Sequence, residues 1–166
     1  MSNSREWNSL SKEYQDLIME YQKEIPMKLG ALAKDLGIIV KKSTLAPNIS
    51  GEIKDTDGIV TIKVNRHDPL TRQRYTLAHE IAHFFLHKHL LENGIEDDVL
   101  YRSTQSNEIE SEANRLAAEI LMPLELVKTL LHKYSIDGVN KEKIYEKVAE
   151  ELNVSTTALL IRLEKI

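Results

Sequence analysis

Residues 74–89 read RYTLAHEIAHFFLHKH, and this stretch decides both the fold and the chemistry open to the chain. It contains the pattern H-E-x-x-H at His79, Glu80 and His83. Two histidines four residues apart lie on one face of a helix, so both imidazoles can bind one Zn²⁺ ion. Glu80 lies one step round the helix, where it can hold a metal-bound water whose pKa zinc lowers to roughly 7. The pattern therefore predicts a zinc-dependent hydrolase in which Glu80 takes a proton from water and passes it to the leaving group.

A zinc site of this kind needs a third protein ligand, and the same helix offers two poor candidates. His89 has the spacing of the metzincin pattern, but that pattern needs a glycine where this chain has Leu86. Without a break in the helix, His89 lies on the wrong face. His87 shares the face of His83, but three ligands in a row on one helix do not easily complete a tetrahedron. We expect His87 to hydrogen-bond near the site or to cap the helix end.

The helix expected over residues 107–122 offers two carboxylates that differ in their surroundings. On a helical wheel, Glu110 falls among the apolar positions, whereas Glu112 falls on the charged face. That charged face also carries Glu108, Arg115 and Glu119. Because a carboxylate among apolar side chains needs a partner, we predict that Glu110 is the third ligand and Glu112 a surface acid. Asn114 lies one turn after Glu110, where it can hydrogen-bond a ligand from behind.

Composition narrows the class of protein further. Hydrophobic residues make up 42% of the 166 residues and charged residues 29%, which is typical of a globular protein. The absence of cysteine excludes disulfides and cysteine metal clusters, and the polar N-terminus does not resemble a signal peptide. The apolar runs are too short to cross a membrane. We therefore expect a cytoplasmic protein that makes no contact with membranes.

Periodicity predicts the elements around the motif. An amphipathic helix is expected over residues 7–25, ending at Pro26, and a shorter one over residues 29–36. Strands are expected at residues 38–40, which read as buried, and at residues 49–53 and 59–64, joined by an Asp-Gly turn. Asp68 and Pro69 are expected to open the motif helix, which should run to about residue 89. The polar residues 92–106 read as a loop.

Three blocks of sequence together resemble the ImmA/IrrE family of metallopeptidases. They are RYTLAHEIAHFFLH at 74–87, ESEANRLAAEILMP at 110–123 and VAEELNVSTTALLIRL at 148–163. The resemblance implies a zincin-like fold with His79, His83 and Glu110 as zinc ligands and Glu80 as the catalytic acid/base. It also implies an endopeptidase of bacteria, phages or mobile elements that relieves repression by cleaving a helix-turn-helix repressor.

The expected fold class is α+β. A zincin-like core over residues 26–123 should contain a small, mostly antiparallel three-stranded sheet packed on helices. An N-terminal amphipathic helix over residues 1–25 should precede it. A helical, helix-turn-helix-like subdomain over residues 124–166 should follow it, with breaks near residues 137–138 and 153–155. The strand at 59–64 has an exposed pattern, so we expect its edge to pair with an extended substrate backbone.

Two points stay open at the level of sequence. A regulator-binding protein of the antitoxin or anti-repressor type, which keeps the metal site without cleaving, would have the same residues. Direct DNA binding is not favoured, because residues 124–166 carry seven basic and seven acidic residues. Several side chains could stabilise the transition state of peptide hydrolysis, and spacing does not choose among them. They are Tyr75, His87, Tyr101, Arg102 and His132.

Overall fold

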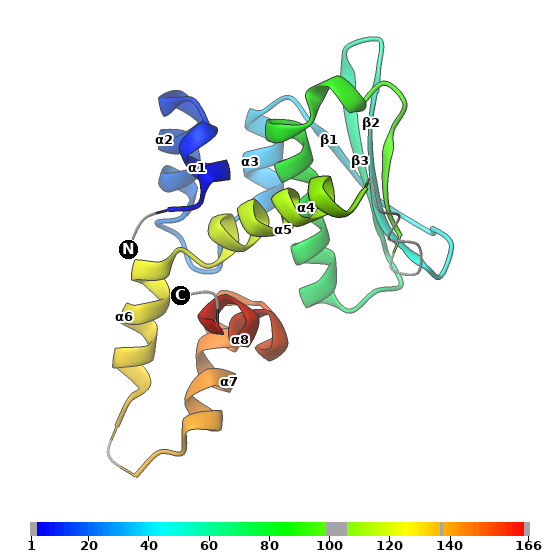
Figure 1. Ribbon diagram of the computed structural model, residues 1–166. Coiled ribbons are helices and arrows are strands. Elements are labelled where there is room, and N and C mark those ends of the chain that lie inside the picture. The colour runs from blue at the N-terminus through cyan, green and yellow to red at the C-terminus, as the bar shows by residue number, and fades with distance from the viewer. Residues whose placement is uncertain (1–2, 99–105, 137, 165–166) are drawn as a thin grey trace.

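The computed structural model describes residues 3–98, 106–136 and 138–164. In these residues, eight α-helices and one four-stranded sheet form the predicted α+β fold (Figure 1). The elements are α1 (Arg5–Ser9), α2 (Lys12–Tyr21), α3 (Leu29–Asp35), β1 (Ile39–Ser43), β2 (Ile49–Thr56), β3 (Ile59–Asn65), α4 (Leu70–Leu86), β4 (Ile95–Asp98), α5 (Ser106–Leu121), α6 (Leu124–Tyr134), α7 (Lys141–Leu152) and α8 (Thr156–Glu164). A short 3₁₀-helix, η1 (Lys88–Leu90), follows α4.

The sheet has the strand order β1-β3-β2-β4. β2 and β3 form the expected antiparallel hairpin, and the turn residues Asp57 and Gly58 have the positive φ angles of 53° and 84° that such a turn needs. β1 pairs with β3 in parallel, whereas β4 pairs with β2 antiparallel. The sheet is therefore mixed, and the prediction of three strands was wrong by one. β4 lies inside the polar stretch that reads as a loop, where one isoleucine precedes three acidic residues.

Two expectations about individual strands were also wrong. β1 is an edge strand on which Ile39 and Val40 are 45% and 36% exposed, so the predicted strand at residues 38–40 is not buried there. β3 is a central strand between β1 and β2, so its edges are already paired and cannot take a substrate. Its alternating pattern has another cause: Ile62 and Val64 point into the core while the residues between them are partly exposed.

The N-terminal segment forms two helices rather than the single predicted one. The Ser4 hydroxyl accepts from the Trp7 N–H and caps α1, and the Ser11 hydroxyl accepts from the Tyr14 N–H and caps α2. A serine that bonds its own backbone in this way begins a helix instead of continuing one. The chain therefore turns at Leu10, whose backbone is extended and whose side chain is buried.

α4 is the helix around which the fold is organised. It packs against α5 on one side and against β2 and β3 on the other, and Ala78, Ile81 and Ala82 in its middle are fully buried. It begins one residue later than expected, because Pro69 rather than Asp68 is the cap, and it ends at Leu86. The small side chains of Ala78 and Ala82 allow the neighbouring elements to approach α4 closely.

Gly51 on β2 sets the distance between the sheet and α4. A Cβ atom at this position would lie 2.5 Å from the Thr76 Cγ2, 3.1 Å from the Lys63 carbonyl oxygen and 3.1 Å from a carboxylate oxygen of Glu80. Real contacts of this kind are almost never so short. Glycine therefore lets the motif helix lie directly against the strand.

α6 follows at the end of α5 that is far from the sheet, and the chain then returns through α7 so that α8 lies below α5 in the view (Figure 1). The predicted breaks are confirmed: Gly138 and Asn153 have positive φ angles, and the Ser155 hydroxyl accepts from the Ala158 N–H to cap α8. The apolar sides of these helices are buried, including Val127, Val148 and Leu159. None of the helices in the described residues is long and apolar enough to cross a membrane.

The close approach at Gly51 can be tested with a pair of glycine variants. Gly51→Ala should lower the free energy of unfolding by about 1–3 kcal/mol, because the added methyl overpacks the contact between β2 and α4. The matched control is Gly30→Ala in α3, where a Cβ would meet nothing within 4 Å. This control should be neutral or stabilising by up to about 1 kcal/mol. Urea unfolding measures both, and an equally stable Gly51→Ala protein would contradict the packing described.

Candidate metal centre

His79 and His83 on α4 and Glu110 on α5 bring three ligand atoms together. The Nε2 atoms of the two histidines lie 3.1 Å apart. The two carboxylate oxygens of Glu110 lie 2.8 Å from His79 Nε2 and 3.1 Å from His83 Nε2. All three ligand atoms lie within 4.8 Å of one another, so this cluster could hold a metal ion. Two imidazoles and a carboxylate are a donor set that suits Zn²⁺.

The other ring nitrogen of each histidine is held from behind. The Nδ1 of His79 lies 3.0 Å from the side-chain oxygen of Asn114, which can only accept. His79 Nδ1 therefore carries a proton, and its Nε2 is turned towards Glu110. The Nδ1 of His83 lies 2.8 Å from the Nδ1 of His87. Hydrogen bonds of this kind orient the rings of metal-binding histidines and select the tautomer that can bind.

Glu112 is not the surface acid that the helical wheel predicted. Its side chain is 27% exposed, and one carboxylate oxygen lies 2.9 Å from His87 Nε2 while the other lies 3.0 Å from Arg5 Nη2. The face of α5 that reads as solvated is covered in part by α1: Glu119 on this face is 6% exposed, whereas Glu108 is 76% exposed in its side chain. The wheel of one helix cannot show which neighbour packs on its charged side.

Glu80 is completely buried beside the cluster. Among the described residues, neither of its carboxylate oxygens has a hydrogen-bond partner. Burial, together with the negative charges of Asp97, Glu110 and Glu52, raises the pKa of this carboxyl well above its usual range, although His79 opposes the shift. Burying a carboxyl group without a hydrogen-bond partner costs free energy. A water bound to a metal ion at the neighbouring cluster would supply such a partner. The residues thus fit a metal ion with a bound water.

One proton is shared within the cluster. Burial lowers the pKa of His79, but its hydrogen bond to Glu110 and the nearby carboxylates raise that pKa to about 9. Burial lowers the pKa of His83 to about 4, and the charge on His79 contributes. Burial raises the pKa of Glu110, but its hydrogen bonds to both histidines lower that pKa to about 2. These contacts therefore favour a charged His79 beside an ionised Glu110 in the metal-free protein.

A cleft of about 620 Å³ opens next to Glu110 and Asn114. Tyr75 lines it, and its hydroxyl donates to the backbone oxygen of Asn114 at 3.4 Å. Burial and the charge of Asp97 raise the pKa of Tyr75 to about 12, so the hydroxyl keeps its proton at neutral pH. Arg72 of α4 and Arg162 of α8 line the same cleft, and only the fold shows that these distant segments meet there.

His132 and His89, two other candidates from the sequence, lie elsewhere. His132 is exposed on α6 and does not line the cleft, and Tyr101 and Arg102 fall outside the described residues. His89 lies in η1 and is not part of the ligand cluster, in agreement with its rejection as a ligand.

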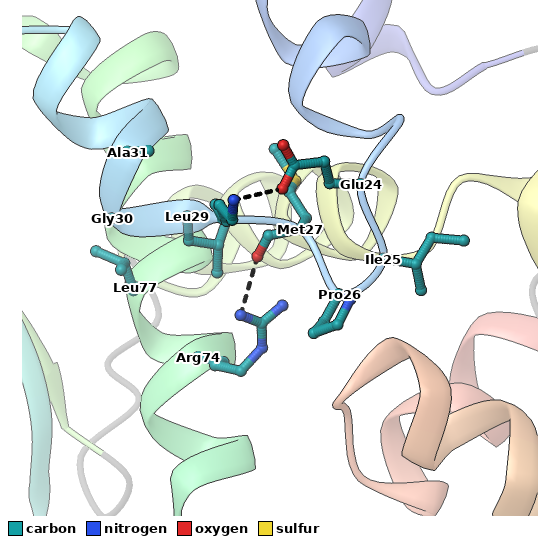
Figure 2. A pocket seen from close by; sticks show the side chains of 10 residues that line it. Glu24, Ile25, Pro26, Met27, Leu29, Gly30, Ala31, Arg74 and Leu77 are labelled. Carbon is teal, nitrogen blue, oxygen red and sulfur yellow. Dashed lines mark hydrogen bonds and ion pairs between the residues drawn. The ribbon is translucent and has the colours of Figure 1, made fainter.

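A second cavity, of about 600 Å³, lies between residues 24–31 and α4 (Figure 2). The Arg74 guanidinium beneath it donates from Nη1 to the Met27 backbone oxygen at 3.0 Å and from Nε to the Asn153 backbone oxygen at 3.3 Å. Its lining contains none of the ligand residues. Arg74 thus joins three segments of the fold.

Two histidines one helical turn apart, a carboxylate from the next helix and an unpartnered glutamate define the site of a metal-dependent hydrolase. Residues 33–164 match the family Peptidase M78, the IrrE N-terminal-like domain. The chain therefore belongs to this family of metallopeptidases, as the three sequence blocks indicate. Among curated proteins, no sequence matches the chain.

The shared proton gives a test in the metal-free protein. An NMR titration should show His79 charged up to about pH 9, instead of the ordinary 6.5, and His83 neutral down to about pH 4. Because folding raises the pKa of His79, its contribution to stability is complete below pH 6.5 and is lost as the pH rises through 9. The His79→Gln variant, in which the signal of His79 is missing, identifies which titration curve belongs to this residue. If both histidines titrate near pH 6.5, the cluster does not share a proton in this way.

Proposed function

We propose that this chain is a cytoplasmic zinc endopeptidase that cleaves a helix-turn-helix transcriptional repressor and so relieves repression. The observation that carries the proposal is the buried Glu80 carboxylate, which lacks a partner among the described residues and lies next to a cluster of three metal-binding side chains. Family membership supports the peptidase activity. The repressor as substrate is supported by the resemblance of the three sequence blocks.

His79, His83 and Glu110 would hold the zinc ion, and Asn114 and His87 would orient the two histidines. The bound ion supplies a water acidic enough to act as a nucleophile near neutral pH. Glu80 would accept a proton from the attacking water and would deliver it to the leaving amine. Its position suits this double role, since the carboxyl is fully buried beside the ligand cluster and has no hydrogen-bond partner among the described residues.

Substrate binding would use the cleft. β4 is an edge of the sheet, and Asp97 of this strand lines the cleft. An extended peptide could add to the outer edge of β4, which replaces β3 as the strand for this role. The Tyr75 hydroxyl, protonated in the cleft, would donate to the oxyanion that forms on the scissile carbonyl. Together these features support a zincin-like arrangement of the core over residues 26–123.

Metal content tests the ligand set. The purified protein should contain about one zinc ion per chain, measured by plasma mass spectrometry after dialysis. Glu110→Ala should lose most of it, because two buried histidines alone leave the site incomplete. Glu108→Ala, on the same helix but 76% exposed in its side chain, is the matched control and should keep its zinc. A wild-type protein that binds no zinc even after reconstitution would rule out the proposed mechanism.

Cleavage tests the role of Glu80. The wild-type protein should cleave its repressor when the two are expressed together, as detected by immunoblot. Glu80→Gln should retain zinc and lose cleavage by about 10²-fold or more, because the amide cannot accept the proton. If Glu80→Gln still relieves repression without cleavage, the chain acts instead as a regulator-binding protein that keeps a metal site.

A further inference from the structure

α1 is fastened to α5 at three points along one face. Glu119 accepts hydrogen bonds from the backbone and hydroxyl of Ser4. Glu6, which is 3% exposed, accepts from Arg115 Nη2 at 2.8 Å. Glu112 accepts from Arg5 Nη2 at 3.0 Å. Trp7 and Leu10 are buried in the same contact, so α1 is a fixed part of the fold.

The contact between Arg5 and Glu112 is the first in a series of contacts that reaches the metal cluster. Arg5 contacts Glu112, Glu112 contacts His87 Nε2 at 2.9 Å, and His87 Nδ1 contacts His83 Nδ1 at 2.8 Å. His83 and His87 are both buried, at 0% and 4% exposed. An unbroken line of hydrogen bonds therefore runs from the N-terminal helix to a predicted metal ligand.

The direction of each hydrogen bond in this line follows from Glu112. A carboxylate can only accept, so His87 donates from Nε2 and leaves the lone pair of its Nδ1 for His83. With a metal in place of the contact between His83 Nε2 and Glu110, His83 would then donate from Nδ1, which leaves its Nε2 free to bind that metal. If Glu112 were absent, His87 could carry its proton on Nδ1. Two N–H groups would then face each other, unless His83 moved its own proton to Nε2 and lost the ability to bind.

We propose that Glu112 is a positioning residue for the metal centre, and that Arg5 makes the N-terminal helix α1 part of its support. The inference rests on the zinc site proposed above. Residues 1–32 lie outside the part of the chain that matches the family, so α1 adds this support to the shared domain. Arg5 is 65% exposed, and it therefore contributes less than the half-buried Glu112.

The test is zinc affinity, measured by competition with a chelator in the full-length protein. Glu112→Ala should weaken zinc binding by about 10- to 100-fold. Glu108→Ala is the matched control, because Glu108 also lies near Arg5, at 3.8 Å, but makes no hydrogen bond with His87. It should leave the affinity unchanged. Glu112→Gln keeps an oxygen that can accept from His87 and should recover most of the affinity, which a loss of packing alone would not explain. Arg5→Ala should weaken binding by only a few-fold.

Further readouts separate this role from a purely structural one. In zinc-loaded protein, nitrogen NMR of the histidine rings should find the His87 proton on Nε2 in the wild type and partly on Nδ1 in Glu112→Ala. If Glu112→Ala is too unstable to purify, the zinc affinities of Glu112→Gln and Arg5→Ala are compared with that of the wild type instead. A few-fold loss in Arg5→Ala, with most of the affinity kept in Glu112→Gln, then supports the inference, and an unchanged affinity in Arg5→Ala contradicts it. Unchanged affinity in both Glu112→Ala and Arg5→Ala, with stoichiometric zinc in the wild type, overturns this inference alone. Absence of zinc from the wild type overturns the proposed function as well.

Discussion

Three buried polar side chains of α4, His79, Glu80 and His83, lie beside the partly exposed Glu110 of α5, and the rest of the structure depends on this energetically unfavourable arrangement. Removing such groups from water is unfavourable unless each has a partner. Glu110 pairs with both histidines, and Asn114 and His87 satisfy the outer ring nitrogens. Glu80 has no hydrogen-bond partner in the described residues. The free-energy cost of burying these groups is therefore lowest when a metal ion and its water are bound.

Close packing is the condition for these contacts. Gly51 lets α4 lie against the surface of β2, and α4 and α5, which pack against each other, carry fully buried alanines at positions 78, 82, 113 and 117. Small residues at these places keep the helices near enough for one carboxylate to reach two histidines on the opposite helix. α8 lines the cleft beside them, and it lies within the part of the chain that matches the family.

Much of this could be predicted from sequence, and the limits have physical causes. His79, His83 and Glu110 stand out because spacing on one helix and polarity on an apolar face are local signals. β4 was not predicted because it has only four residues and is held in the sheet by its pairing with β2, a contact that the local sequence does not show. The roles of Glu112 and Glu119 were missed because α1, about a hundred residues away in sequence, covers them. Local periodicity shows that one face of a helix is polar, but it does not show which element packs against that face.

Crystals of the zinc-loaded protein, with diffraction collected on both sides of the zinc absorption edge, would test the central claim most directly. The account predicts one strong anomalous peak per chain, about 2.0–2.1 Å from the Nε2 atoms of His79 and His83 and about 2.0–2.2 Å from Glu110, with a water between it and Glu80. A peak bound through His87 or His89 instead, or no peak near α4 in protein that contains zinc, would contradict it.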